Sequence, residues 1–239
     1  MSAFTLAPAT TLKSPNPVSR ILKPLAQISL VMATFLAVKA LFSFTMFAGQ
    51  ISVVCMVIAA TIMLRFDGKT WSDMGLRWAP SRRALVKGAG LVAATLVISI
   101  AAAVAIETLI LALFDIPDTG RAPDLSSPAI YLLVLATVWT SNAFGEEMIN
   151  RGFLMNRFAT MFGGGSSAWI LAAFAQAFLF GLCHYGYGLM GIIATGVIGL
   201  VYGLMYLFAK RSLWPLIIAH GINNTIGMTM LFLGQNSAA

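Results

Sequence analysis

Seven long apolar stretches restrict the fold of this sequence more than any other feature. The hydrocarbon core of a bilayer is about 30 Å thick, and a helix crosses it with about 20 apolar residues. Backbone groups in lipid must be hydrogen-bonded within the protein, which makes helices the expected spanning elements. The sequence therefore predicts an all-α, polytopic transmembrane helical bundle with about seven to eight spanning helices. The stretches run over approximately 25–47, 48–64, 84–114, 128–150, 166–185, 188–209 and 212–234.

The basic residues gather on one side of the predicted membrane. The net charge of +7 could indicate a nucleic-acid partner, but in a chain that is 59% hydrophobic the positions of the charges matter more than their sum. By the positive-inside rule we expect the N-terminus in the cytoplasm, the C-terminus outside and no nucleic-acid partner. The bases of this side are Lys13, Arg20, Lys23, Arg65, Lys69, Arg77, Arg82, Arg83, Lys87, Lys210 and Arg211, whereas the loop before residue 128 holds Asp115, Asp118 and Asp124 with Arg121.

Glycine and cysteine add two smaller expectations. Glycine recurs through 188–203, which predicts close packing of this helix against its neighbours rather than catalysis. The two cysteines, Cys55 and Cys183, lie in apolar stretches, where cysteine most often behaves as a small hydrophobic residue. We therefore expect no disulfide framework.

Three ionisable residues lie in the stretch FGEEMINRGF, residues 144–153, inside an otherwise apolar region. Each charge at mid-bilayer costs on the order of 3 kcal/mol, so Glu146, Glu147 and Arg151 together would oppose insertion by roughly 9 kcal/mol if unpaired. Glu147 and Arg151 have the four-residue spacing of a helical salt bridge, and we interpret them as a structural pair. Glu146 lies about 100° further round the helix and needs a different partner.

The two histidines of the chain, His184 and His220, also lie in apolar stretches. In FGLCH, Phe180 precedes His184 by one helical turn, and in HGINN, Asn224 follows His220 by one turn. A histidine in an apolar helix is most often a packing residue, which is the simpler interpretation. Because Glu146 lacks a partner, we favour the alternative that it meets both histidines in one cavity.

Two kinds of hydrolytic chemistry are open to such a cluster. A glutamate in a low-dielectric cavity suits a general base that activates water, and an imidazole with the Asn224 amide could form an oxyanion hole. Alternatively, Glu146, His184 and His220 match the ligand set of a catalytic zinc ion with two histidines and one glutamate. Neither GxSxG nor HExxH is present, so serine-hydrolase and zincin chemistry lack sequence support.

The order of three motifs resembles the CPBP family of intramembrane proteases, which contains the type II CAAX prenyl endopeptidases and the Abi or bacteriocin-immunity proteins. The motifs are EExxxR at 146–151, FxxxH at 180–184 and HxxxN at 220–224. The resemblance covers about 127–233, and DMGLRW at 73–78 is similar to the segment before the family's third span. It implies an endopeptidase that acts on a membrane-embedded or lipidated peptide in the lipid bilayer, with peptide-bond hydrolysis in general favoured over strict prenyl-cysteine specificity.

The resemblance also implies roles for individual residues. Glu146 would activate water, His184 would hold that water, and His220 with Asn224 would stabilise the oxyanion. The family is described both as metalloproteases and as glutamate-dependent enzymes, so zinc held by Glu146, His184 and His220 stays open and no cofactor is certain. The supporting residues would be Glu147, Arg151 and Phe180.

On this basis the chain divides into a polar N-terminal tail, two helices with an interfacial basic loop, a third helix with an outer loop, a CPBP-like catalytic core and a C-terminal tail. The boundaries are 1–24, 25–83, 84–126, 127–234 and 235–239. The N-terminal tail has the composition either of an organellar targeting peptide or of a disordered cytoplasmic tail. We favour the second and expect a bacterial inner membrane.

The length of the fourth helix decides whether one site can form. If this helix covers 128–150, Glu146 lies near its cytoplasmic end while His184 lies near the outer end of the fifth helix. A helix over about 129–161 instead puts Glu146 near its middle. We favour the longer helix, together with an inward bend of the chain around His184.

Two other functions could use the same residues. A non-proteolytic scaffold or immunity protein would keep the cluster for structure or partner binding, and a proton-coupled transporter would use Glu and His as a relay. The transporter is less favoured, because the sequence has neither an inverted repeat nor paired broken helices. Lys39 and Glu107, which also lie in apolar stretches, belong to none of the motifs, and we assign no function to them.

Overall fold

The structure is built from helices. The computed structural model describes residues 17–77, 81–114 and 122–237, and within these ranges it contains helices and turns but no strand. The predicted all-α fold is confirmed. Several residues used in the sequence predictions lie outside the described ranges, namely Lys13, Trp78, Asp115, Asp118 and Arg121.

The chain begins with three long helices, α1 (Pro17–Leu41), α2 (Ala48–Phe66) and α3 (Arg82–Leu113). A continuous composite helix follows, made of α4 (Pro128–Thr137), the π-helical segments η1 (Val138–Gly145) and η2 (Met148–Leu154), and α5 (Met155–Met161). The remaining elements are α6 (Ser166–Cys183), the short 3₁₀ helix η3 (Tyr185–Tyr187), α7 (Gly188–Phe208) and α8 (Trp214–Ser237).

Seven helical segments in the described part of the chain are long and apolar enough to cross a membrane. The chain is therefore a multi-pass integral membrane protein, as predicted. Its first helix already begins at Pro17, inside the segment 1–24 that we predicted as a polar tail, because proline is well accommodated in the first turn of a helix.

The fourth span is the longer of the two versions. It covers Pro128–Met161, so Glu146 lies near its middle, and the shorter version ending at residue 150 is wrong. The two arginines in the second half of this span are each paired with an acidic side chain. Arg151 contacts Glu147, and Arg157 lies 2.9 Å from Asp67 through its Nη2 atom.

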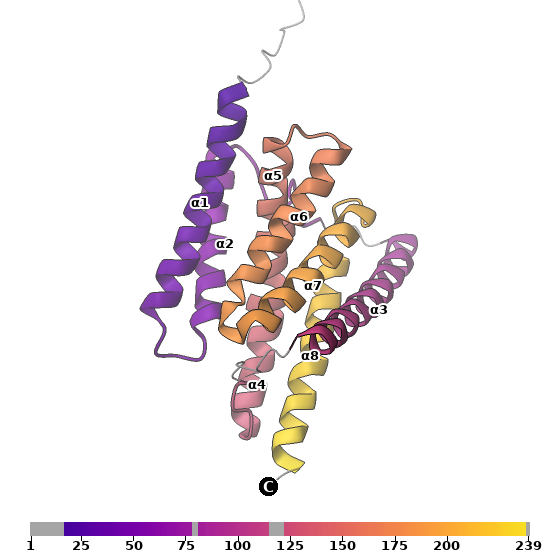
Figure 1. Ribbon diagram of the computed structural model, residues 1–239. Helices are drawn as coiled ribbons and strands as arrows, with labels where there is room; N and C mark the ends of the chain where they lie inside the picture. The colour runs from indigo at the N-terminus through magenta and orange to yellow at the C-terminus, as the bar shows by residue number, and fades with distance from the viewer. Residues whose placement is uncertain (1–16, 78–80, 115–121, 238–239) are drawn as a thin grey trace, which may run out of the picture.

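The turn after α6 does not extend as far as the ends of α4 and α8 (Figure 1). Figure 1 shows α1 and α2 as a pair on one side, α3 at the opposite edge, and α6 and α7 between them. The α6–α7 turn, which contains His184, lies well short of the ends of α4 and α8 (Figure 1). The expected inward position of His184 thus arises from the short, tilted helix α6, which has only 18 residues.

Glycines bring α6 and α7 into close contact, as the sequence predicts. A Cβ atom added at Gly203 would lie 2.8 Å from Nε2 of Gln176, and one added at Gly199 would lie 2.9 Å from Cδ1 of Phe180. Neither position accepts a larger residue without movement of its neighbour. The close packing holds the α6 segment that ends at His184 directly against α7.

Two contacts fasten the loops on the basic face of the bundle. Asp67 after α2 lies 2.6 Å from Lys23 of α1 and 2.9 Å from Arg157 of α5, which joins three helices. The following interfacial segment docks on the α7–α8 turn, where the amide of Leu213 donates to the Gly75 carbonyl over 3.0 Å. Gly75 has φ of +101°, and a Cβ atom there would collide with the Arg211 carbonyl, so glycine is required.

Candidate active site

Glu146 and Glu147 lie in the composite helix between the two π-helical segments η1 and η2. π-Helical turns close hydrogen bonds from i to i+5, are rare, and are found frequently at functional sites. Glycines on both sides of the pair let the widened helix approach its neighbours. A Cβ atom at Gly145 would lie 2.7 Å from Cγ1 of Val53 in α2, and one at Gly152 would lie 3.3 Å from the Trp71 ring.

The predicted pair of Glu147 and Arg151 is present and fully buried. Nη1 of Arg151 donates to Oε1 of Glu147 over 2.9 Å, and both side chains have 0% exposure. Nη2 of Arg151 donates to the Gly199 carbonyl of α7 over 3.0 Å. The guanidinium also lies 5.2 Å from each of the ring centroids of Phe180 and Tyr202, so it is enclosed by three helices.

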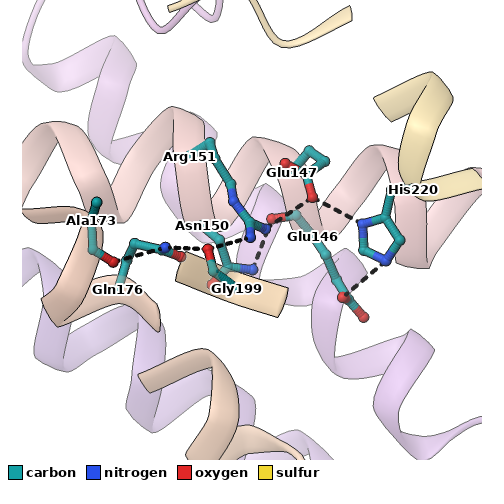
Figure 2. Close-up of polar contacts among 8 residues, drawn as sticks. All are labelled: Glu146, Glu147, Asn150, Arg151, Ala173, Gln176, Gly199 and His220. Atoms are coloured by element: carbon teal, nitrogen blue, oxygen red, sulfur yellow. Dashed lines mark hydrogen bonds and ion pairs between the residues drawn. The ribbon is translucent and has the colours of Figure 1, made fainter. Parts of the chain in front are cut away.

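His220 lies between the two glutamates. Its Nδ1 is 2.9 Å from Oε1 of Glu147, and its Nε2 is 3.9 Å from Oε2 of Glu146 (Figure 2). An ionised carboxylate only accepts hydrogen bonds, so Nδ1 carries a proton and donates a hydrogen bond to Glu147. Glu147 therefore fixes the orientation of the ring, and Nε2 is left facing Glu146.

His184 enters from the C-terminal end of α6. Its Nδ1 lies 2.8 Å from the carbonyl oxygen of Phe180, and the two rings are 4.6 Å apart in an edge-to-face arrangement. A carbonyl oxygen only accepts, so Nδ1 of His184 is the donor. In the neutral ring Nε2 is then an acceptor, which has the correct polarity to receive an O–H bond of water.

Two cavities adjoin Glu146. The first, which we name the polar cavity, has a volume of about 90 Å³. It brings together every residue predicted to be catalytic and every one predicted to be supporting: Glu146, His184, His220, Asn224, Glu147, Arg151 and Phe180. The catalytic and supporting roles of these residues remain predictions.

The second, the apolar cavity, has a volume of about 290 Å³ and lies between α1, α2, the composite helix and α6. Glu146 and His184 line both cavities. The rest of the apolar cavity is mostly hydrophobic, with Met32, Phe35 and Leu179 among its walls. The carboxylate of Glu146 can thus meet a polar molecule on one side and an apolar one on the other.

Part of the chain matches a known protein family. Residues 127–226 match the family described as type II CAAX prenyl endopeptidase, Rce1-like, and the match includes all three motifs. The match covers 100 of the 239 residues and supports membership of the chain in the CPBP family. Rce1-like proteins form a protease family, which supports hydrolase activity for this chain in general terms. No curated protein sequence and no solved structure matches the chain.

Polar residues that none of the three motifs contains also lie at the candidate site. Asn142 lines both cavities one turn before Glu146, and its side chain makes no hydrogen bond to another described residue. Gln176 donates to the Gly199 carbonyl over 2.8 Å, so that one oxygen joins α7 to both α6 and Arg151 (Figure 2). A polar residue in an apolar stretch was the available signal for both, but spacing alone could not show which residue faces the site.

Lys39 lies on the wall of the apolar cavity. Its Nζ donates to the Cys183 carbonyl over 3.2 Å and lies 4.2 Å from the centroid of the Tyr185 ring. The ammonium group is thus held by a carbonyl and an aromatic face, which satisfies a charge inside an apolar stretch. Glu107, the other unassigned charge, lies exposed on α3.

The residues predicted to hold zinc are not arranged as a ligand set in the structure. Among the described residues, no three His, Cys, Asp or Glu side chains are placed so that they could hold one metal ion. His220 directs Nδ1 at Glu147, and its Nε2 is 3.9 Å from Glu146. This arrangement leaves Glu146 and the two histidines available to act on water directly.

Proposed function

We propose that this Rce1-like protein is an intramembrane endopeptidase that hydrolyses a peptide bond of a membrane-associated protein or peptide. The observation that carries the proposal is the position of Glu146, which lines both the polar and the apolar cavity and lies 3.9 Å from His220. Water can approach from the polar side and a peptide in extended form from the apolar side.

In the proposed reaction Glu146 acts as the general base. It accepts a proton from water while the water oxygen attacks the carbonyl carbon of the substrate. The C–N bond of the resulting tetrahedral intermediate then breaks, and the same proton passes from Glu146 to the leaving nitrogen. The products are a carboxylic acid, which keeps the second proton of the water until it ionises, and an amine. His184 orients the water through its Nε2.

His220 would support this step through its contacts with both carboxylates. The Nδ1 atom donates to Glu147, so positive charge that develops on the ring during proton movement is stabilised by a buried carboxylate. When the ring is fully protonated, Nε2 becomes a donor aimed towards Glu146 and the reacting oxygen. This combines the role that the resemblance implies for His220 with the contact to Glu147.

The oxyanion requires donors besides His220. We assign this role to the amides of Asn224 and Asn142, which line the polar cavity from α8 and from the composite helix. Side-chain amides that are held in position before the reaction stabilise a developing negative charge better than mobile water does. Asn142 lies one turn before Glu146, so it can face the same carbonyl as the base.

The lining of the apolar cavity indicates the class of substrate. Its walls of methionine, leucine and phenylalanine suit an aliphatic side chain or a lipid chain attached to the substrate, and methionine adapts to irregular apolar groups. The family match names a prenyl endopeptidase. We propose membrane-embedded and lipidated peptides as the substrate class, with hydrolysis of the peptide bond as the common feature.

The test is proteolysis by the purified full-length protein in liposomes, with a library of membrane-anchored peptides, some of them lipidated. Wild type should cleave members of the library, and Glu146→Gln should reduce the rate by at least about a hundredfold, because general-base catalysis typically contributes 10²–10⁴. Glu107→Gln is the matched control, since it makes the same change at an exposed position of another span. Its rate should equal that of wild type.

Two results would argue against the proposal. Equal cleavage by wild type and Glu146→Gln would remove Glu146 from the reaction. No cleavage of any peptide by a folded wild-type protein would favour a non-proteolytic scaffold or immunity protein. Each reaction is run with and without a zinc chelator, and loss of wild-type activity that zinc restores would mean that the site rearranges to take a metal.

A further inference from the structure

A groove separate from the active site runs between α3 and α8. It has a volume of about 520 Å³, and its walls come from one face of α3, including Ala84, Gly88 and Leu96, and from Trp214 and Ile218 at the start of α8. α3 lies at the edge of the bundle and contacts only α7 and α8 closely among the described helices (Figure 1). The groove therefore borders the lipid that surrounds this edge.

The groove has the length and polarity of a hydrocarbon chain. The α3 residues that line it extend from Ala84 to Leu96, which corresponds to about 18 Å along a helix. A Cβ atom added at Gly88 would meet no atom within 4 Å, so the space next to this glycine is open. Neighbouring side chains that point away from the groove, such as Val86, are exposed to the same apolar surroundings.

One end of the groove is positively charged. Arg77 lines it there, and Nε of Arg77 donates to the Ser72 carbonyl over 2.7 Å, which fixes the direction of the exposed guanidinium. Further bases, Arg82, Arg83 and Lys87, are exposed on the first turns of α3. Asp73, the acid of the interfacial segment, accepts from the backbone and side chain of Thr70 and neutralises only part of this charge.

We propose that this groove binds an anionic phospholipid of the bilayer, with an acyl chain between α3 and α8 and the phosphate on Arg77. A guanidinium matches the oxygens of a phosphate with two parallel hydrogen bonds. Clustered bases at a membrane surface attract lipids with a net negative charge over zwitterionic ones. The apolar groove supplies the position of the lipid, and the bases supply its selectivity.

The bound lipid stabilises α8, and through it the active site. Trp214 and Ile218 of the groove wall lie on the same helix as His220 and Asn224. A chain that fills the groove holds the first turns of α8 against α3. The lipid therefore raises the thermal stability of the folded protein, and this effect does not depend on whether the chain cleaves peptides.

The experiment measures thermal unfolding and bound lipid for the full-length protein in detergent, with added phosphatidylglycerol or phosphatidylcholine of identical acyl chains. Phosphatidylglycerol should raise the midpoint of unfolding in a saturable way and be retained in native mass spectra, and phosphatidylcholine should do so much less. Arg77→Gln should weaken phosphatidylglycerol binding by about fivefold, the effect of one base near a charged surface.

A matched pair of glycine variants tests the groove itself. Gly88→Phe places a side chain in the groove and should abolish the effect of phosphatidylglycerol. Gly90→Phe adds the same side chain two residues further along α3, where the space is also open but the residue does not line the groove, and it should retain the effect. If Gly88→Phe does not fold, the amount of phosphatidylglycerol that Arg77→Gln retains in native mass spectra still tests whether the groove binds this lipid.

Three outcomes would overturn the proposal. The first is an unchanged phosphatidylglycerol effect in folded Gly88→Phe, and the second is equal binding of the two lipids by wild type. The third is protection by a lipidated peptide but not by phosphatidylglycerol, which would make the groove a substrate site.

Discussion

Glu147 contacts two groups at once, and the two contacts can be separated experimentally. Glu147→Leu alone leaves Arg151 buried without its countercharge and should lower the free energy of unfolding by about 3–5 kcal/mol. Glu147→Leu combined with Arg151→Met replaces the pair by apolar side chains and should recover most of this loss. The measurement is denaturant unfolding of the purified variants in detergent.

Peptidase activity distinguishes a positioning role for Glu147 from a structural one. In the double variant His220 has lost its acceptor at Nδ1, so activity should stay at least about a hundredfold below wild type, comparable to the loss of other buried orienting groups. A double variant that is both stable and fully active would show that Glu147 serves only to balance Arg151.

The proposed role of the Asn142 amide as an oxyanion donor can be tested by a single substitution. Asn142→Ala should lower kcat by about 10²–10³, the usual effect of one lost oxyanion donor, with little change in KM. Thermal stability should stay the same, because the side chain makes no hydrogen bond to another described residue. Asn236→Ala, at an exposed position near the end of α8, is the control and should leave kcat unchanged.

The sequence predicted which residues lie together around the polar cavity where charge in an apolar stretch had to be explained, and their roles remain predictions. Glu146, Glu147 and Arg151 were conspicuous because unpaired charges oppose insertion, and the histidines were few enough to be considered together. Asn142 was not predicted, because an uncharged amide in a helix costs little and has no diagnostic spacing. The contact of Glu147 with His220 joins α8 to the composite helix, and no local pattern encodes such a contact.

At the scale of elements, the number of spanning helices followed from hydropathy, but the form of the fourth did not. Its π-helical segments depend on how Gly145 and Gly152 pack against α2 and Trp71, and these are tertiary contacts. The sequence predicted the length of the fourth helix correctly, because the glycine-rich turn after residue 161 marks where the helix can end. The number and the length of the spanning helices can therefore be predicted from this sequence, whereas the π-helical form of the fourth span cannot.

Asp67 supplies a prediction for the joint between α1, α2 and α5. Burial alone raises the pKa of Asp67, but contacts with Lys23, Gln27 and Arg157 outweigh this and hold the pKa below its ordinary value. A carboxyl group with a lowered pKa contributes stability above its ordinary pKa and loses it as the pH falls through the folded value. Wild type should therefore lose thermal stability below about pH 5 more steeply than Asp67→Asn. Parallel curves for the two proteins would contradict the role of this residue.

The two bases at this joint should contribute unequally. Lys23 is 62% exposed, so Lys23→Met should cost less than about 1 kcal/mol. Arg157 is 6% exposed and contacts an equally buried Asp67, so Arg157→Met should cost on the order of 3 kcal/mol. Unfolding of both variants at pH 7 checks the order, and equal losses would mean that water screens both pairs alike.

At the scale of the whole molecule, the helices define two opposite faces. The α1–α2 turn and the C-terminal end of α8 lie towards one face, and the α5–α6 and α7–α8 turns lie towards the other (Figure 1). The second face carries most of the basic residues, including Lys210 and Arg211 of the α7–α8 turn. The structure gives this relative arrangement, whereas the positive-inside rule assigns the basic face to the cytoplasm.

The assignment can be tested with single cysteines. With Cys55 and Cys183 replaced by alanine, new cysteines at the exposed positions Ser43 and Asn236 report one face, and a cysteine at the exposed Ser72 reports the other. A membrane-impermeant thiol reagent applied to intact cells should label S43C and N236C but not S72C, and disruption of the membrane should make S72C reactive. The reverse labelling pattern would mean that the same fold is inserted with inverted topology and that the basic face lies outside the cell. Labelling of S43C and S72C from the same side would instead contradict α2 as a spanning helix, since only that helix and the first residues after it separate the two positions.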